Sequence, residues 1–293
     1  SFDLAGFVTV IVSSASLLVA LSQGHSWGWS SWQTLTLLAV GLVFLAVFIA
    51  VELRVETPLL NLRVLSNARY SITLIITSII TISLYSGMLL TPVFLQNIQF
   101  VTPFDTGLIL LPSSLVMVIA TPFVGKLYNR VGPRPFLVAG ILLLAVGTLA
   151  LSWLSVDISH SYILFWMIVR NLGISLVMMP VSNAGMEQIP PHLSGHASSI
   201  SNWTRNVFGS FAIAVFTSLL ASRSTVHGKA MAASGVTDMN QIKIMAFTMS
   251  VNDVYLIATI IVLVSLPISL FIGKNGKAGS AQSAHAPAVA VRK

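Results

Sequence analysis

The sequence predicts an all-α integral membrane protein with about eight membrane-spanning helices. Of its 293 residues, 55% are hydrophobic and only 8% are charged, whereas a soluble domain carries about 25% charged residues. The apolar residues form long runs without alternation, and a helix needs about 20 such residues to cross a bilayer. Because every backbone group must be hydrogen-bonded inside lipid, these runs indicate helices rather than barrel strands.

A charged segment divides the expected spans into a leading pair and a group of six. This segment, 52–69, contains Pro58 and is the best internal boundary. We expect two helices and a linker over 1–66, a six-helix bundle over 67–273, and a disordered tail over 274–293, which is rich in small and polar residues. The predicted spans are 4–22, 33–51, 70–95, 106–124, 135–154, 161–181, 198–221 and 252–272.

Lysine and arginine predict the orientation, because short cytoplasmic connections carry most of the positive charge. The cations before the third span, between the fourth and fifth spans and in the tail would all lie on one side. Both ends of the chain are therefore expected to be cytoplasmic, in a cell membrane. Residues 182–197 should form a cytoplasmic connection. Residues 222–251 should form a long outer loop with a short apolar stretch that is too short to span.

The connection between the fourth and fifth spans is short, basic and conformationally specified, and we interpret it as a hinge. Two glycines permit unusual backbone angles, and prolines suit the first turn of a new helix. The pattern resembles the cytoplasmic signature of the major facilitator superfamily, with Asn129 where that family usually has Asp. The resemblance implies that Arg130 and Arg134 bond helix ends or acids and hold the cytoplasmic face closed. The matching positions are Gly125, Leu127, Arg130, Gly132 and Arg134.

The resemblance extends over nearly the whole chain, including Phe-Asp-Leu-Ala-Gly at the start and Pro-Leu-Leu-Asn-Leu-Arg in the linker. These segments are similar to EmrB/QacA-type, fourteen-helix drug:proton antiporters, with this chain as helices seven to fourteen. The resemblance implies proton-driven export of amphipathic compounds by alternating access, as other transporters rock two halves about a midplane site. The implied partners are a small-molecule substrate, protons, the lipid bilayer and a missing amino-terminal half. The chain would then be a piece of a longer protein.

Arg170 is the most informative single residue, because it falls near the middle of the sixth span. A cation at that depth costs at least about 2.5 kcal/mol, so it should face a cavity or a partner. It either bonds backbone carbonyls of a neighbouring helix or lines the transport pathway. Arg170 and Gly173 also resemble a second family signature by pseudo-symmetry. The candidate substrate-binding residues are Tyr85, Gln96, Arg170, Asn171 and Asn202.

The sequence shows no intramembrane carboxylate and no pattern of a metal site, a cofactor site or an enzyme. No Asp or Glu falls in the middle of a span, so the coupling carboxylates would lie in the missing part, with Asp105 and Asp253 as lesser candidates. There is no cysteine, and His192 and His196 fall in an expected loop, so we expect no metal, no cofactor and no enzyme activity. The loop cations indicate topology rather than nucleic-acid binding. The alternatives are a transporter of another small solute or a non-transporting membrane scaffold.

Overall fold

The computed structural model describes residues 3–55 and 58–272, and the described chain is almost entirely helical, without strands. The predicted tail over 274–293 lies outside the described residues. Short 3₁₀ segments occur at Leu62–Ser66, Leu151–Trp153 and Pro191–Leu193. The long helices are α1 Leu4–Trp27, α2 Trp32–Glu52, α3 Ala68–Asn97, α4 Pro103–Val131, α5 Pro133–Ala150, α6 His160–Met186, α7 Ser194–Ala233 and α8 Met239–Leu270.

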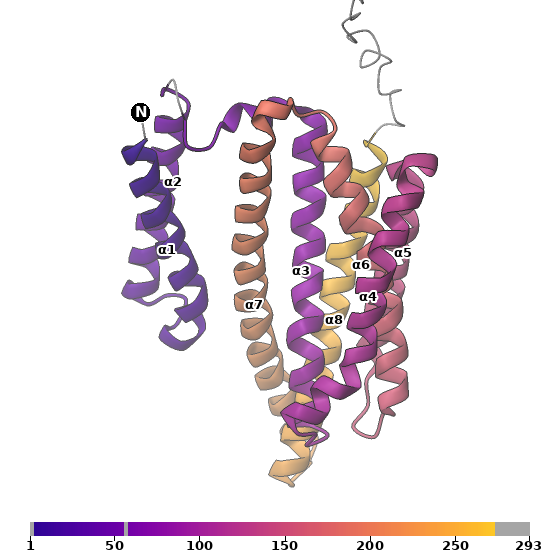
Figure 1. Ribbon diagram of the computed structural model, residues 1–293. Coiled ribbons are helices and arrows are strands. Elements are labelled where there is room, and N and C mark those ends of the chain that lie inside the picture. The colour runs from indigo at the N-terminus through magenta and orange to yellow at the C-terminus, as the bar shows by residue number, and fades with distance from the viewer. Residues whose placement is uncertain (1–2, 56–57, 273–293) are drawn as a thin grey trace, which may run out of the picture.

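Within the described ranges, eight helical segments are long and apolar enough to cross a membrane. The prediction of an all-α protein with about eight spans is therefore confirmed. The helices run alternately up and down, so α1 begins and α8 ends at the same end of the bundle (Figure 1). We call this the terminal end and the other the opposite end. The terminal end is the one that the cations predict to be cytoplasmic, and that orientation stays a prediction.

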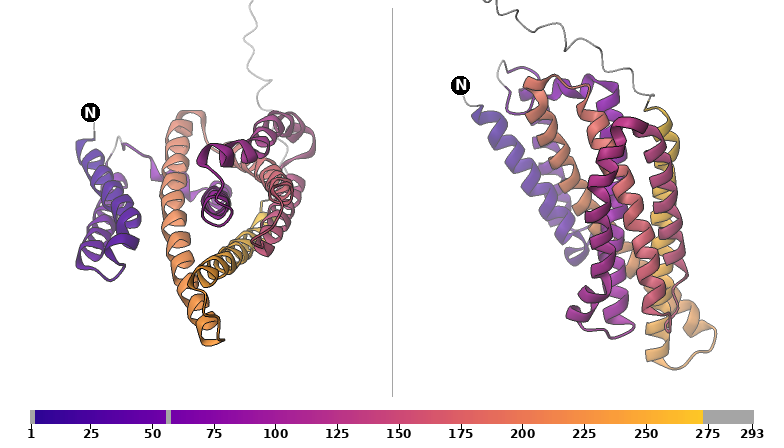
Figure 2. Two further views of the ribbon diagram at one scale, coloured as in Figure 1. Left: turned by 90° about the horizontal axis from the view of Figure 1, so that it is seen from below. Right: turned by 45° about the vertical axis from the view of Figure 1, so that its right-hand side comes forward.

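The last six long helices form one bundle with α3 at its centre. α3 contacts α6, α7 and α8, while α5 packs between α6 and α8, and α4 packs mainly on α6. The pair α1–α2 stands beside this bundle and touches it through α1 and α7 (Figures 1 and 2). The bundle therefore has an enclosed side around α5, α6 and α8, and less enclosed spans in α4 and α7.

Apolar side chains fill the bundle in two large clusters, and a smaller third cluster packs at the terminal end around Tyr70 and Ala197. Toward the opposite end, Leu90, Phe94 and Phe216 belong to a cluster of fully buried residues. Toward the terminal end, a second cluster is contributed mainly by α3, α5 and α6. α5 and α6 approach so closely that a Cβ on Gly173 would lie 2.5 Å from the backbone nitrogen of Leu144. Small residues at such crossings allow van der Waals packing where lipid supplies no hydrophobic driving force.

Two indole hydrogen bonds attach the leading pair to α7. Trp203 of α7 donates to the Oγ of Ser14 in α1 at 2.7 Å. Near the other end of the pair, Trp29 donates to the Oγ of Ser218 in α7, also at 2.7 Å. Ser14 and Trp29 are 15 positions apart in the leading pair, and their partners Trp203 and Ser218 are also 15 positions apart in α7. α1 and α7 therefore run in the same direction with a fixed register.

The predicted loop over 222–251 is wrong. α7 continues to Ala233 and α8 begins at Met239, so the connection is only a few residues long. Asp238 caps α8 by accepting from the backbone of Asn240 at 2.9 Å. The polar composition of this stretch suggested a loop, but three polar side chains at its start, from α7, bond to Ser250 and Asp253 of α8. Residues 182–197 are likewise mostly helical, with a short connection between α6 and α7.

The connection over 125–134 is also more helical than a loop. α4 continues to Val131 and α5 begins at Pro133, so the two helices meet at Gly132. Gly132 has φ 82°, a positive angle that favours glycine, and it separates the last residue of α4 from the first residue of α5. Pro133 follows as the first residue of α5, where its fixed φ is suited to helix initiation.

Candidate functional site

Arg170 is the largest fully buried side chain among the described residues, with 1% of its surface exposed. It extends from α6 toward α3, where it donates to the backbone carbonyl of Ser83 and, at 3.3 Å, to the Oγ of Ser86. Its Nε has no hydrogen-bond partner, and no carboxylate pairs with it in the described part of the chain. These contacts match the alternative of a buried arginine bonded to a neighbouring helix. A role in the transport pathway stays a prediction.

Two glycines make room for this arginine. A Cβ on Gly147 of α5 would lie 2.9 Å from the backbone nitrogen of Arg170. A Cβ on Gly87 of α3 would overlap the guanidinium itself. Beside the site, the hydroxyls of Thr91 and Tyr255 are hydrogen-bonded to each other and join α3 to α8. The centre of the bundle is therefore a polar layer between the two apolar clusters.

The other predicted substrate-binding residues lie at different depths and on different faces. Asn171 is buried next to Arg170 on α6, with 6% of its surface exposed. Tyr85 of α3 is half-buried and packs against α7. Gln96 lies half-buried near the opposite end of α3, whereas Asn202 is exposed on α7. The structure thus brings Arg170 and Asn171 together and leaves the other three apart.

At the terminal end, three side chains form what we call the terminal clasp: Arg69 of α3, Tyr128 of α4 and Glu187 at the end of α6. Tyr128 donates from its hydroxyl to the Oε1 of Glu187 at 2.6 Å. The Nη2 of Arg69 lies 3.4 Å from the Oε2 of the same carboxylate. One carboxylate therefore ties the ends of three helices together. Tyr128 is buried, whereas Glu187 retains 40% side-chain exposure.

The predicted hinge residues lie beside this clasp without joining it. Gly125 packs against α6, whereas Asn129 and Arg130 are exposed on the last turn of α4. Neither Arg130 nor Arg134 forms an ion pair or side-chain hydrogen bond with another described residue. Both line a surface pocket of about 560 Å³ around Gly132. The contacts to an acid that were expected of Arg130 and Arg134 are made by Tyr128 and Arg69 instead.

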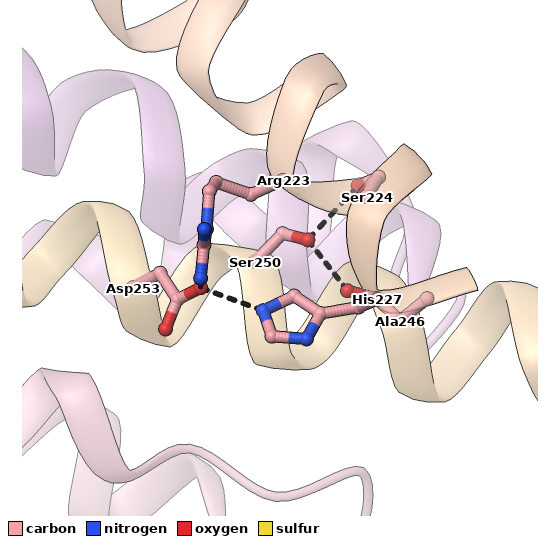
Figure 3. A network of polar contacts seen from close by, with 6 residues as sticks. All are labelled: Arg223, Ser224, His227, Ala246, Ser250 and Asp253. Carbon is pink, nitrogen blue, oxygen red and sulfur yellow. Dashed lines mark hydrogen bonds and ion pairs between the residues drawn. The ribbon is translucent and has the colours of Figure 1, made fainter. Parts of the chain in front are cut away.

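At the opposite end, Arg223 and His227 of α7 meet Asp253 of α8, and we call this group the opposite clasp (Figure 3). The Nε and Nη2 of Arg223 each lie 2.7 Å from the Oδ2 of Asp253. The Nε2 of His227 lies 2.6 Å from the same oxygen. Next to it, Ser224 donates to Ser250 at 3.1 Å. These contacts hold the extended parts of α7 and α8 together.

Sequence reasoning identified neither clasp. Arg223 and His227 are four residues apart, which places them on one helix face, but the loop interpretation of 222–251 concealed that spacing. The pair formed by Tyr128 and Glu187 joins residues 59 positions apart. Nothing in a single sequence indicates that pairing, because it depends on how α4 and α6 pack.

The comparisons with known proteins agree with this architecture. Residues 1–214 match the Major Facilitator Superfamily. The chain is 36% identical over 225 residues to the uncharacterized MFS-type transporter YhcA of Bacillus subtilis, covering 77% of this chain and 42% of the relative. It is 28% identical over 272 residues to the lincomycin resistance protein LmrB of Listeria monocytogenes, covering 93% and 57% respectively.

A third relative is the multidrug resistance protein Stp of Mycobacterium tuberculosis, 32% identical over 221 residues, which are 75% of this chain and 41% of that protein. The chain therefore spans about half the length of the curated relatives that it matches. The family match covers well over half of the chain and includes all helices up to the middle of α7. This chain belongs to the Major Facilitator Superfamily, as a multi-pass helical membrane protein.

Proposed function

We propose that the protein exports amphipathic drugs or other toxic compounds across the membrane, in exchange for protons, by alternating access. The observation that carries this proposal is the match of 93% of the chain to a relative named for lincomycin resistance. Relatives named for multidrug resistance and for tetracenomycin C resistance and export support it. Since the chain spans about half of each relative, the activity belongs to the whole protein.

The packing of the bundle supports the same proposal. Within the six-helix bundle, α4 and α7 are the least buried spans. Their free faces are where a second half would dock, and transporter sites commonly lie between two such halves. The terminal clasp would hold the terminal end shut in one state, and the predicted hinge over 125–134 would move when it opens.

A dye-export assay tests the proposal. The full-length protein is produced in a drug-sensitive bacterium, and accumulation of a fluorescent amphipathic cation is followed with and without a protonophore. We expect lower accumulation than in cells with an empty vector, and recovery of accumulation when the protonophore is added. Equal accumulation in both strains would contradict drug export and favour the scaffold alternative. Export that persists with the protonophore would contradict proton coupling.

A substitution at Arg170 separates its two proposed roles. Arg170→Met removes the charge but keeps a long, adaptable side chain, and replacing a buried charged group by packed apolar atoms is often tolerated. If Arg170 contacts substrate, the variant should reach the membrane at normal levels and lose export. Normal export by this variant would restrict Arg170 to its bonds with Ser83 and Ser86. Arg63→Met, at an exposed position of the linker before α3, is the matched control.

A further inference from the structure

Two carboxyl groups face each other at the terminal end of the leading pair. Asp3 caps α1, and its Oδ1 accepts from the backbone nitrogen of Gly6 at 2.8 Å. Glu52 is the last residue of α2, and its Oε2 accepts from the backbone nitrogen of Leu60 at 3.1 Å. Each carboxyl has thus used one oxygen for a backbone group. Figure 1 shows the start of α1 beside the end of α2.

The second oxygen of each carboxyl is buried and unpaired. Glu52 has 4% of its surface exposed. Its Oε1 and the Oδ2 of Asp3 have no hydrogen-bond partner among the described residues. A single point, the position of a Cβ on Gly6, lies within 2.5 Å of both unpaired oxygens. The unpaired oxygens therefore point into one shared space.

Gly6 leaves that space open. A Cβ built at this position would lie 2.5 Å from the Oε1 of Glu52 and closer still to the Oδ2 of Asp3. Any larger residue would enter the gap between the two oxygens. The helix therefore presents its smallest residue at the point where the carboxyl groups meet.

Two ionised carboxylates do not explain this arrangement. An ionised carboxyl can only accept hydrogen bonds, so neither oxygen could satisfy the other. Each would also be a buried acceptor without a donor, and the two negative charges would repel each other. A single proton removes all three difficulties, because it neutralises one group and makes it a donor to the other. Paired carboxyls that share one proton are a known arrangement.

No other charged group supplies an alternative partner in the described part of the chain. Arg54 follows α2 and is exposed. His196 of α7 faces this region, but its ring contacts the backbone carbonyl of Leu59 and the backbone nitrogen of Asn61. No third His, Cys, Asp or Glu joins the two carboxyls to form a metal-ligand group among the described residues. A proton fits the pair better than a metal ion.

We propose that Asp3 and Glu52 bind one proton between them and form a proton-binding site at the terminal end of the leading pair. The protonated pair ties the start of α1 to the end of α2. Loss of the proton leaves two adjacent negative charges, which would drive the two helix ends apart. The site goes beyond the proposed export function, because it binds its proton whether or not the protein transports drugs.

Infrared spectroscopy of the purified protein in detergent tests this directly. A protonated carboxylic acid has a C=O stretching band that is separate from the carboxylate bands and shifts in D₂O. At neutral pH we expect the unsubstituted protein to show more of this band than either Glu52→Gln or Asp3→Asn, by the intensity of one carboxylic acid group. Protonated acids elsewhere in the protein contribute equally to all three spectra. Gln supplies an N–H donor to the facing carboxylate, and Asn caps a helix about as well as Asp. Both variants should therefore fold.

The matched control is Asp157→Asn, because Asp157 is exposed in the turn before α6. This variant should keep the band. Gly6→Ala places a methyl group between the two oxygens and should weaken or abolish the band with both carboxyls still present. Absence of the band at neutral pH, or an undiminished band in both carboxyl variants, would overturn the proposal. So would a band that appears only after metal cations are removed. The infrared band reports protonation and not transport. The test of the proton-binding site therefore remains valid even if the export assay fails.

Discussion

The two clasps are built from similar groups but join very different parts of the chain. The opposite clasp connects Arg223 and His227 to Asp253, which are neighbours in a helical hairpin 30 or fewer residues apart. The terminal clasp connects Glu187 to Tyr128 and Arg69, across separations of 59 and 118 residues. The first stabilises one hairpin, whereas the second closes the ends of three separate helices.

This difference indicates how each clasp should respond when it is broken. Loss of the opposite clasp should loosen the tips of α7 and α8 without moving the rest of the bundle. Loss of the terminal clasp should change the relative positions of α3, α4 and α6. If the protein works by alternating access, only the terminal clasp is placed to control opening of that end.

The largest effect is expected from Glu187→Ala. It removes the acceptor of both terminal contacts and leaves the buried Tyr128 hydroxyl without its partner. A buried unsatisfied group costs about 1–3 kcal/mol, so the closed arrangement should lose about 5- to 150-fold in population. The printed sequence has no cysteine, so an engineered cysteine pair joining the ends of α4 and α6 can report this by its rate of disulfide formation. An unchanged rate would show that the clasp does not hold these ends together.

Tyr128→Phe should have a smaller effect of the same kind. It removes the hydroxyl but keeps the ring, and the half-exposed Glu187 can then be solvated. We expect a loss of about 1 kcal/mol in the stability of the closed end, measured by the same disulfide assay. The double variant with Glu187→Ala should be less affected than Glu187→Ala alone, because Tyr128→Phe removes the buried hydroxyl that Glu187→Ala leaves unpaired. Additive effects would contradict a direct contact.

Asp253→Ala should act locally. The side chains of Asp253 and Arg223 are 29% and 40% exposed, and ion pairs with such access to water contribute about 0–1 kcal/mol. Hydrogen exchange should become faster in the extended parts of α7 and α8, and high salt should reduce the difference from the unsubstituted protein. Faster exchange at the ends of α4 and α6 would contradict the separation between the two clasps.

The smallest effect is expected from Arg69→Ala. Its contact with Glu187 is 3.4 Å long, and the carboxylate remains accessible to water. A pair of this kind contributes less than about 0.5 kcal/mol, so disulfide formation between α4 and α6 should change less than in Tyr128→Phe. An effect as large as that of Glu187→Ala would show that the ion pair, rather than the tyrosine bond, closes this end.

The sequence predicted the eight spans because their signal is local: long apolar runs without charge. It placed the connection between the fourth and fifth helices over 125–134, where glycine and proline occur, but α4 continues to Val131, past the predicted end at 124. It missed the continuation of α7 to Ala233, because this stretch is polar and its contacts with α8, made by Arg223, Ser224 and His227, are tertiary. The helices in this stretch are supported by hydrogen bonds between α7 and α8, and a hydropathy pattern carries no information about such contacts.

The candidate site was predictable only in part. Arg170 was recognisable from its depth in an apolar run, and the structure shows it buried. Its partner on α3 is a backbone carbonyl, which every residue carries, so no sequence pattern could identify it. The pairing of Asp3 with Glu52 depends on how α1 packs on α2, and the small residue that permits it, Gly6, resembles many other helix glycines. The assignment of Tyr85, Gln96 and Asn202 to substrate stays a prediction.

The most direct test compares Glu187→Ala with Asp253→Ala in the full-length protein. Drug export is measured in inverted membrane vesicles under one imposed pH gradient, at matched protein levels. Our account predicts that Glu187→Ala lowers export at least about tenfold, which corresponds to about 1.4 kcal/mol, whereas Asp253→Ala changes it less than about twofold. Equal losses in both variants, or a larger loss in Asp253→Ala, would contradict the claim that the terminal clasp controls access.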